Sequence, residues 1–326
     1  MTYRNKLIAL SATAGALALA ILLSFVLSPQ AMQRRSSAKR ILSDSDAKAV
    51  SGLDLSVGGA ALSIRKGAEG WVMEREGVKY PASATKVETF LSAVRKARTI
   101  SKAGSNRESW ADFGLEGAQA RTVVFLDSKG QELTRIVLGS SAGSTKEIFL
   151  AMGDSGAVHR AQDSFGSYLR LEDDAWGELR LFDDSLAVDD VQGISLLANI
   201  PALSGQAPKM VDYQLTRNKK EWKLSGDDAA VLDTKRVNDF LDAIITAQGD
   251  SFAKDATGLG APAARFSLTD GRRNVVRVVD AFFREASNDF ILTVDSSGFG
   301  YVMNSSIFTP KVKAVDELKL EAVQAE

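Results

Sequence analysis

A pentapeptide of small residues matches a catalytic motif. Gly139-Ser-Ser-Ala-Gly143 fits the pattern G-x-S-x-G, in which a tight strand-to-helix turn exposes a nucleophilic serine. A strand is expected before it, at residues 133–138, but residues 147–151 alternate like a second strand and not like a helix. The segment therefore predicts a hairpin loop. A cell-envelope hydrolase that uses Ser140 or Ser141 stands as an alternative hypothesis.

The single histidine and three acidic pairs are the other candidates for chemistry. His159 lies in an expected strand, and with one histidine and no cysteine a zinc site would need an unusual set of carboxylates. Asp173-Asp174, Asp183-Asp184 and Asp189-Asp190 offer oxygen ligands for calcium, but their spacing matches no known calcium loop. We interpret His159 as a surface or edge residue and the pairs as solvated. No catalytic, cofactor-binding or metal-binding residue is predicted.

Length and composition limit the functional classes to which the protein can belong. The 326 residues suit two domains and a membrane segment. Forty basic side chains balance 41 acidic ones, so nothing global indicates nucleic-acid binding, which usually needs a basic domain. The absence of cysteine excludes disulfides and thiolate chemistry, and no phosphate-binding glycine loop occurs.

One apolar stripe occurs twice and organises the rest of the chain. Residues 87–94 read VETFLSAV, and residues 237–244 read VNDFLDAI, 150 positions later. In each copy the apolar residues fall at i, i+3, i+4 and i+7, the spacing of a helix that lies on a core. For the helix starts, Thr85 with Glu88 indicates a capping box, and Asp233 or Thr234 indicates the second cap.

Alternating segments surround both helices and predict hairpins and antiparallel strands. The predicted fold class is α+β: an N-terminal transmembrane helix followed by two tandem repeats of an antiparallel sheet with a helix. The expected organisation is an anchor at 1–35, a linker at 36–49, a first repeat at 50–163, an acidic connector at 164–190, a second repeat at 191–308 and a tail at 309–326.

The N-terminal segment is long enough to cross a membrane. Residues 7–28, from Leu7 to Ser28, contain no charge and would rise about 33 Å as a helix, against a hydrocarbon core of about 30 Å. The run is longer than the apolar part of a usual signal peptide, which favours an uncleaved anchor in the lipid bilayer. Basic residues on both sides leave the orientation open.

The polar faces of the two helices differ although their apolar faces agree. The first copy is basic, whereas the second has acidic residues at Asp239, Asp242 and Asp250. The basic residues of the first copy are Lys86, Arg95, Lys96, Arg98 and Lys102. Shared apolar positions indicate a requirement of the fold, so any partner-binding role of the polar faces must belong to one copy.

Four short motifs resemble the bacterial family known by a domain of unknown function, DUF4340. They are Trp71-Val-Met, Tyr80-Pro-Ala-Ser83 ahead of the first helix, Phe113-Gly-Leu115, and Ile136-Val-Leu-Gly139. Ser83 stands where the family often has an acid, and the second copy lacks Tyr-Pro. The resemblance is good over residues 60–190 and looser beyond. It implies a membrane-anchored protein with its soluble part outside the cytoplasm, in some members an accessory subunit of ABC-type exporters, including gliding-motility systems, and no known catalytic residues.

Together these observations favour a non-enzymatic, single-pass protein of the bacterial inner membrane. Its C-terminal region would be periplasmic and would bind a partner, expected to be an ABC-type permease and ATPase complex. A scaffold that binds cell-wall or lipid components is a further alternative.

Overall fold

A computed structural model of the chain describes residues 39–143, 146–162, 165–182, 186–203, 207–254, 256, 258–270, 272, 274–295 and 297–320. The segment expected to be a membrane anchor, residues 7–28, lies outside this part. Among the residues that are described, no helix is long and apolar enough to span a bilayer. The chain divides into two compact units, one with residues 39–76 and 84–171 and the other with residues 77–83 and 172–320.

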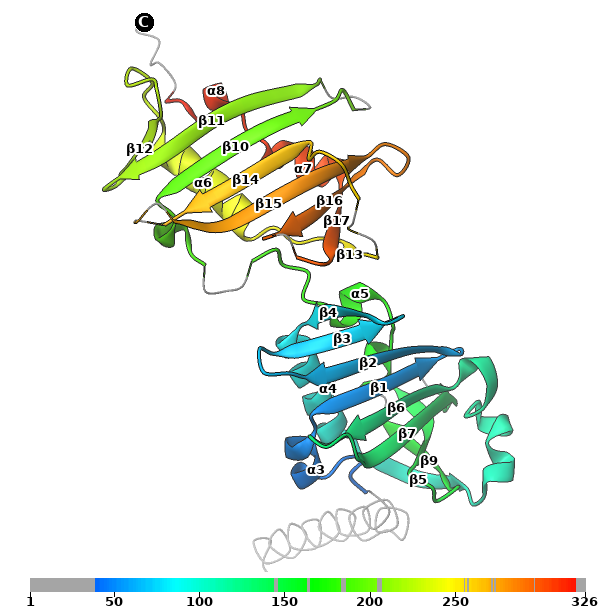
Figure 1. The fold of residues 1–326 in the computed structure, drawn as a ribbon. Helices are drawn as coiled ribbons and strands as arrows, with labels where there is room; N and C mark the ends of the chain where they lie inside the picture. Colours follow the sequence, from blue (N-terminus) through cyan, green and yellow to red (C-terminus); the bar gives the residue numbers. More distant parts are fainter. Residues whose placement is uncertain are drawn as a thin grey trace, which may run out of the picture. The chain divides into compact units, whose positions relative to one another are not determined.

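Nine strands form the first sheet, in the order β4-β3-β2-β1-β6-β7-β8-β9-β5 (Figure 1). Their bounds are β1 Gly52–Val57, β2 Ala60–Lys66, β3 Trp71–Arg75, β4 Val78–Ala82, β5 Thr99–Gly104, β6 Arg121–Leu126, β7 Glu132–Ser141, β8 Glu147–Met152 and β9 Val158–Gln162.

Eight strands form the second sheet, in the order β12-β11-β10-β14-β15-β16-β17-β13. They are β10 Gly193–Ile200, β11 Lys209–Asn218, β12 Glu221–Leu224, β13 Ser251–Ala253, β14 Ala264–Thr269, β15 Val275–Arg284, β16 Asp289–Val294 and β17 Gly300–Asn304. The neighbouring strands pair antiparallel, so the expected α+β class with mainly antiparallel sheets is confirmed.

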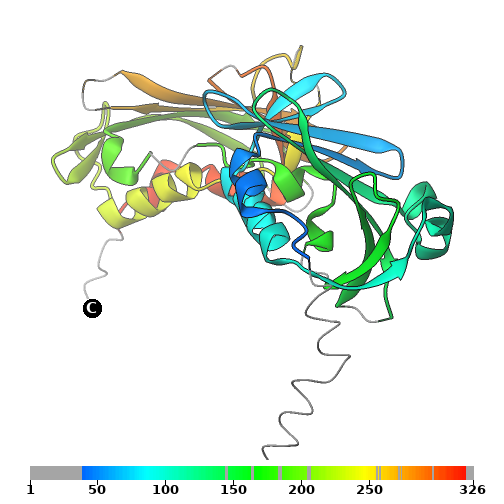
Figure 2. The ribbon, with the colours of Figure 1, turned by 90° about the horizontal axis from the view of Figure 1, so that it is seen from below.

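The helices are few and mostly short. The α-helices are α3 Asp44–Ala49, α4 Ala84–Lys96, α5 Asp173–Trp176, α6 Thr234–Ile245, α7 Ser305–Phe308 and α8 Val315–Leu318. Single 3₁₀ turns are η1 Arg107–Ser109, η2 Ala111–Phe113, η3 Gly117–Gln119, η4 Gly166–Tyr168, η5 Val188–Asp190 and η6 Thr309–Lys311. The two long helices, α4 and α6, each lie on one face of a sheet (Figure 2).

The stripes that predicted these two helices form the centre of each core. In α4 the buried residues are Val87, Phe90, Leu91 and Val94, and in α6 they are Val237, Phe240, Leu241, Ile244 and Ile245. Phe90 is fully buried and stacks on Phe125 of β6, with ring centroids 6.0 Å apart. The helical period of the apolar residues was therefore a sound guide to both the helix and its buried face.

The two sheets share one strand order once β4 is set aside. Read along each sheet, β3-β2-β1-β6-β7-β8-β9-β5 corresponds to β12-β11-β10-β14-β15-β16-β17-β13, and α4 and α6 follow equivalent strands. The β4 strand has no counterpart among the described residues of the second sheet.

The correspondence extends into the stretch expected as a connector. Ser83 N donates to Trp176 O and Glu178 N donates to Pro81 O, both just before α4. Before α6 the same pattern recurs, because Asp233 N donates to the carbonyl of Leu318 and Leu320 N to that of Val231. Residues 165–171 pack within the first unit, and residues 172–182 belong to the second. The described residues of the acidic stretch at 165–182 thus belong to the two folded units.

Of the two helix caps predicted from the sequence, the one for α6 is confirmed and the one for α4 is not. Because α4 begins at Ala84, Thr85 lies inside its first turn, where its carbonyl accepts from the Thr89 hydroxyl at 2.7 Å, and the expected capping box at Thr85 is wrong. Asp233 does cap α6, since its Oδ1 accepts from the backbone N–H groups of Lys235 at 2.8 Å and Arg236 at 3.2 Å.

Replacing Asp233 with alanine is expected to lower the free energy of unfolding by about 1 kcal/mol, because two backbone N–H groups lose their acceptor. Asp239→Ala on the exposed face of the same helix removes only an ion pair to Lys235 and should cost less than about 0.5 kcal/mol. Urea denaturation of both variants measures the difference. Equal losses would show that the cap does not stabilise α6.

Candidate functional site

The pentapeptide Gly139-Ser-Ser-Ala-Gly143 ends strand β7 and enters a hairpin to β8. The next element that the structure describes is strand β8 and not a helix, so the described part of this hairpin lacks the strand–turn–helix context of a nucleophile elbow. The Ser140 hydroxyl donates to Phe113 O at 3.0 Å, and the Ser141 hydroxyl donates to Glu147 O at 3.4 Å. Both serines therefore make hydrogen bonds that hold the local structure together.

His159 lies on the other face of the sheet from the Ser140 side chain. Leu138, Leu150 and His159 are register partners across β7, β8 and β9. The preceding row across the same strands, Val137, Ala151 and Val158, packs with Phe113 and the 3₁₀ segment on the face to which Ser140 points. His159 shares the face of Leu138 and Leu150, opposite to that of Val137. The register of β7 shifts between Leu138 and Ser141, and the Ser140 hydroxyl lies on the Val137 side, so His159 is directed away from Ser140 and cannot take its proton.

Burial is the main cause that lowers the pKa of His159 below its ordinary value of 6.5, and the charges of Lys39 and Lys102 lower it further. The unfolded chain then binds a proton more readily than the folded one. Stability should therefore fall as the pH drops from about 6.5 towards the lower pKa of the folded state.

Lys102→Gln is expected to raise the pKa of His159, because it removes one of the two charges that oppose protonation. An NMR titration follows the lone imidazole directly. The matched control is Lys220→Gln on the second unit, which should leave the titration unchanged. A pKa for His159 at or above its ordinary value in the unmodified chain would contradict the burial argument.

The described acidic pairs have structural partners. Asp173 Oδ2 accepts from Phe252 N at 3.0 Å, and Asp190 Oδ2 accepts from Ala187 N at 2.9 Å. Asp189 pairs with Arg217 at 3.0 Å. Asp183 and Asp184 lie outside the described residues. Across the part of the chain that is described, no three His, Asp or Glu residues converge as they would around a metal ion.

The short motifs of the first copy are also structural. Trp71, Tyr80, Ala82 and Ser83 are buried. Trp110 and Leu115 cover Val137, Ala151 and Val158 in a second small core on the outer face of the first sheet. Trp110 lies in no motif or periodic segment of the sequence, and its indole N–H donates to Gly156 O at 2.8 Å. The buried residues of these motifs contribute to the packing of the first unit.

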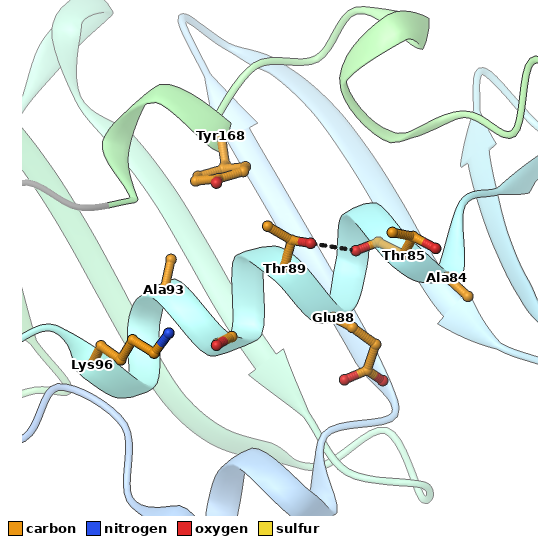
Figure 3. A pocket seen from close by; sticks show the side chains of 8 residues that line it. Ala84, Thr85, Glu88, Thr89, Ala93, Lys96 and Tyr168 are labelled. Atoms are coloured by element: carbon orange, nitrogen blue, oxygen red, sulfur yellow. Dashed lines mark hydrogen bonds between the residues drawn. The ribbon is translucent and has the colours of Figure 1, made fainter.

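An open groove on the exposed face of α4 is the clearest candidate for a binding site in the first unit. Figure 3 shows the Tyr168 ring of η4 placed over the helix beside Thr89 and Ala93. The groove encloses about 720 Å³ and is lined by Ala84, Thr85, Glu88, Thr89, Ser92, Ala93, Lys96 and Tyr168. Its hydroxyl groups, carboxylate and ammonium suit hydrogen bonding to a partner surface, whereas an activated nucleophile is missing from this lining.

The corresponding face of α6 is different. Lys235 and Asp239 occupy the places of Thr85 and Thr89 and form an ion pair at 2.5 Å. Lys311 Nζ donates to Ala243 O at 2.9 Å beside that helix. Within the described residues, the α4 groove is therefore not reproduced on α6. Nothing in the sequence pointed to Tyr168, since it lies in the stretch expected as a connector.

A family model described as a domain of unknown function (DUF4340) matches residues 71–265, which is more than half of the chain. The match begins at β3 and ends in β14, so it includes parts of both sheets. No curated protein and no solved structure matched the chain.

Proposed function

From the premise that the chain belongs to the DUF4340 family, we propose that it is a membrane-anchored, extracytoplasmic binding subunit of an ABC-type transporter complex. The family description names no reaction, and the motifs that carry the resemblance are mostly buried. In this proposal the chain contains two copies of one module, held at the inner membrane by residues 7–28.

One observation carries the proposal: the two copies agree in their buried residues and differ in their exposed ones. Phe90 and Phe240 occupy the same core place, but Thr89 and Asp239 on the neighbouring exposed face do not match. A fold requirement explains the shared positions. A surface that contacts a partner explains why, among the described residues, the groove beside Tyr168 occurs on α4 and is not reproduced on α6.

The hydrolase alternative has less support. Its nucleophile would be Ser140 or Ser141, yet both hydroxyls donate to backbone carbonyls. The lone histidine points to the face opposite Ser140, and Ser141 is in register with Ala161 and not with His159. An acyl-transfer site needs a nucleophile within reach of a base.

The test is co-purification of the full chain from detergent-solubilised membranes. We expect a permease or an ATPase of an ABC-type transporter to be recovered with it. Thr89→Arg should reduce that recovery because it fills the groove with a long charged side chain, whereas Asp239→Arg at the equivalent place on α6 should not.

Two results would overturn the proposal. Recovery of the chain without any transporter component would exclude an ABC-type permease or ATPase as its partner. Loss of an enzymatic activity of the purified chain in Ser140→Ala, with the fold intact, would favour the hydrolase.

A further inference from the structure

Basic side chains gather where the N-terminal part of the described chain joins the first unit. They come from three separate segments: residues 39–40, the end of α4 and strand β5. We name this set the basic face; its members are Lys39, Arg40, Arg95, Lys96, Arg98 and Lys102. All are exposed except Arg98, which is partly exposed.

Backbone contacts hold the three segments together. Lys39 N donates to Thr99 Oγ1 at 2.9 Å, and Thr99 N donates to Lys39 O at 3.0 Å. Arg40 and Arg98 form an isolated antiparallel bridge. The Arg98 guanidinium donates to Arg95 O at 2.5 Å, which places it at the C-terminal end of α4. The basic face is thus fixed by the fold and is not a run of neighbours in sequence.

The positive charge of this face is only partly neutralised. Asp44 of α3 is shared by Arg40 and Arg95, the latter at 3.4 Å. The ion pairs found within the described residues include these two arginines but none of the three lysines of the face. The charges of Lys39 and Lys102 both lower the pKa of His159, which places the two lysines near one another. Net positive charge therefore remains on this surface.

The second copy shows that the fold does not need this charge. Ile245, Thr246 and Gln248 stand at the places of Arg95, Lys96 and Arg98. Nearby in the second copy are Asp242 and Asp250, with Arg180, which bridges Gln248 as Arg40 bridges Arg98, and Lys311 beside α6. The acidic residues offset these two basic ones, so the concentration of positive charge is not repeated. Since both copies build the same strand order, a requirement of the module cannot explain the basic face.

The face also lies at the point where the chain continues towards the apolar segment. Lys39 follows Ser28, the last residue of that segment, by eleven positions, a stretch that can reach at most about 40 Å. Arg34 and Arg35 lie within it and add two more positive charges. If the segment crosses a bilayer, the basic face is tethered within reach of the lipid headgroups.

We propose that the basic face binds anionic phospholipid headgroups of the membrane that holds the anchor. This inference rests on the proposed anchoring, and it assigns the first unit, not the second, as the one held against the bilayer. Exposed lysine and arginine side chains near an anionic surface are attracted to it over about 8 Å at physiological ionic strength. The α4 groove, on the same helix, would then be presented close to the membrane-embedded part of a partner.

The chain contains no cysteine, so one engineered cysteine gives a unique probe position. Ala103→Cys places a fluorophore on the exposed residue beside Lys102 without removing any charge of the face. The full chain is reconstituted in vesicles of phosphatidylcholine, with or without phosphatidylglycerol, that carry a headgroup-attached quencher. Ala229→Cys, exposed in the second unit, is the matched probe.

We expect quenching at position 103 to be about twofold or more stronger in the anionic vesicles, and to lose this excess at about 1 M salt, where screening acts within about 3 Å. Quenching at position 229 should not depend on lipid charge. The double variant Lys96→Glu with Lys102→Glu should abolish the excess at position 103, whereas Lys220→Glu with Lys223→Glu on the second unit should not.

Two failures are distinguishable. If alkaline carbonate extracts the chain from the vesicles, the anchoring in the proposed function is wrong. If the chain resists extraction but quenching at position 103 is the same in neutral and anionic vesicles, the anchor stands and the lipid-binding role of the basic face is overturned.

Discussion

Phe90→Ala is expected to lower the free energy of unfolding by about 3–5 kcal/mol. Phe90 is fully buried and lies between Phe125, at a centroid distance of 6.0 Å, and Phe165, at 6.5 Å. Truncation to alanine removes these contacts and leaves a cavity that α4 cannot close without leaving the sheet. The loss should appear in urea denaturation as a lower midpoint with an unchanged slope.

The duplicated stripe provides matched controls. Phe240→Ala should cost a similar amount, because Phe240 is 4% exposed at the equivalent place on α6. Glu88→Ala, on the exposed side of α4, should change stability by less than about 0.5 kcal/mol. A loss below about 1 kcal/mol for Phe90→Ala would mean that the stripe is not the centre of the first core.

Much of the fold followed from periodicity. The two apolar stripes predicted α4 and α6, and alternation predicted the hairpins β2–β3 and β11–β12, which pair antiparallel. These features depend on neighbours within a few residues, so local sequence contains the information. The agreement between the two copies strengthened each assignment, since a chance pattern would not recur in the same order.

Features that depend on distant contacts were missed. Strand β5 is short and polar, and it exists because β9 pairs with it. The 3₁₀ segment that carries Trp110 has no regular period; its place is set by the outer face of β7 and β8. The cap expected at Thr85 was wrong, and the residue before α4, Ser83, makes its backbone bond to Trp176 O, which is distant in the sequence.

The candidate surfaces were predictable in part. The contrast between the basic first helix and its acidic counterpart was visible in the sequence and located four residues of the basic face. Lys39 and Arg40 join them only through tertiary bonds to Thr99 and Arg98. Tyr168, which forms one wall of the α4 groove, came from a stretch in which nothing marked it out. The charges of the two copies can be compared from the sequence alone, whereas the shape of a groove depends on residues that only the fold brings together.

Gly139 gives the sharpest distinction between a structural and a catalytic interpretation of the G-x-S-x-G segment. A Cβ placed on Gly139 would lie 2.2 Å from Phe113 O and 3.0 Å from the carbonyl carbon of Gly114. Both neighbours are backbone atoms, so relief requires the 3₁₀ segment to move away from β7. The same segment holds Trp110 and Leu115 against the sheet, which couples this contact to the small outer core.

Gly139→Ala is therefore expected to lower the free energy of unfolding by about 3 kcal/mol, the upper end for overpacking, because the clash is with backbone. Gly67→Ala is the control in the same unit, since its Cβ would meet nothing closer than 3.4 Å, and it should change stability little. Ser140→Ala should cost only about 1 kcal/mol, the value of its bond to Phe113 O. A packing role predicts that Gly139→Ala lowers the free energy of unfolding much more than Ser140→Ala does. If Gly139→Ala proves neutral, β7 and the 3₁₀ segment are not in contact as described, and the small-residue loop again needs a functional explanation.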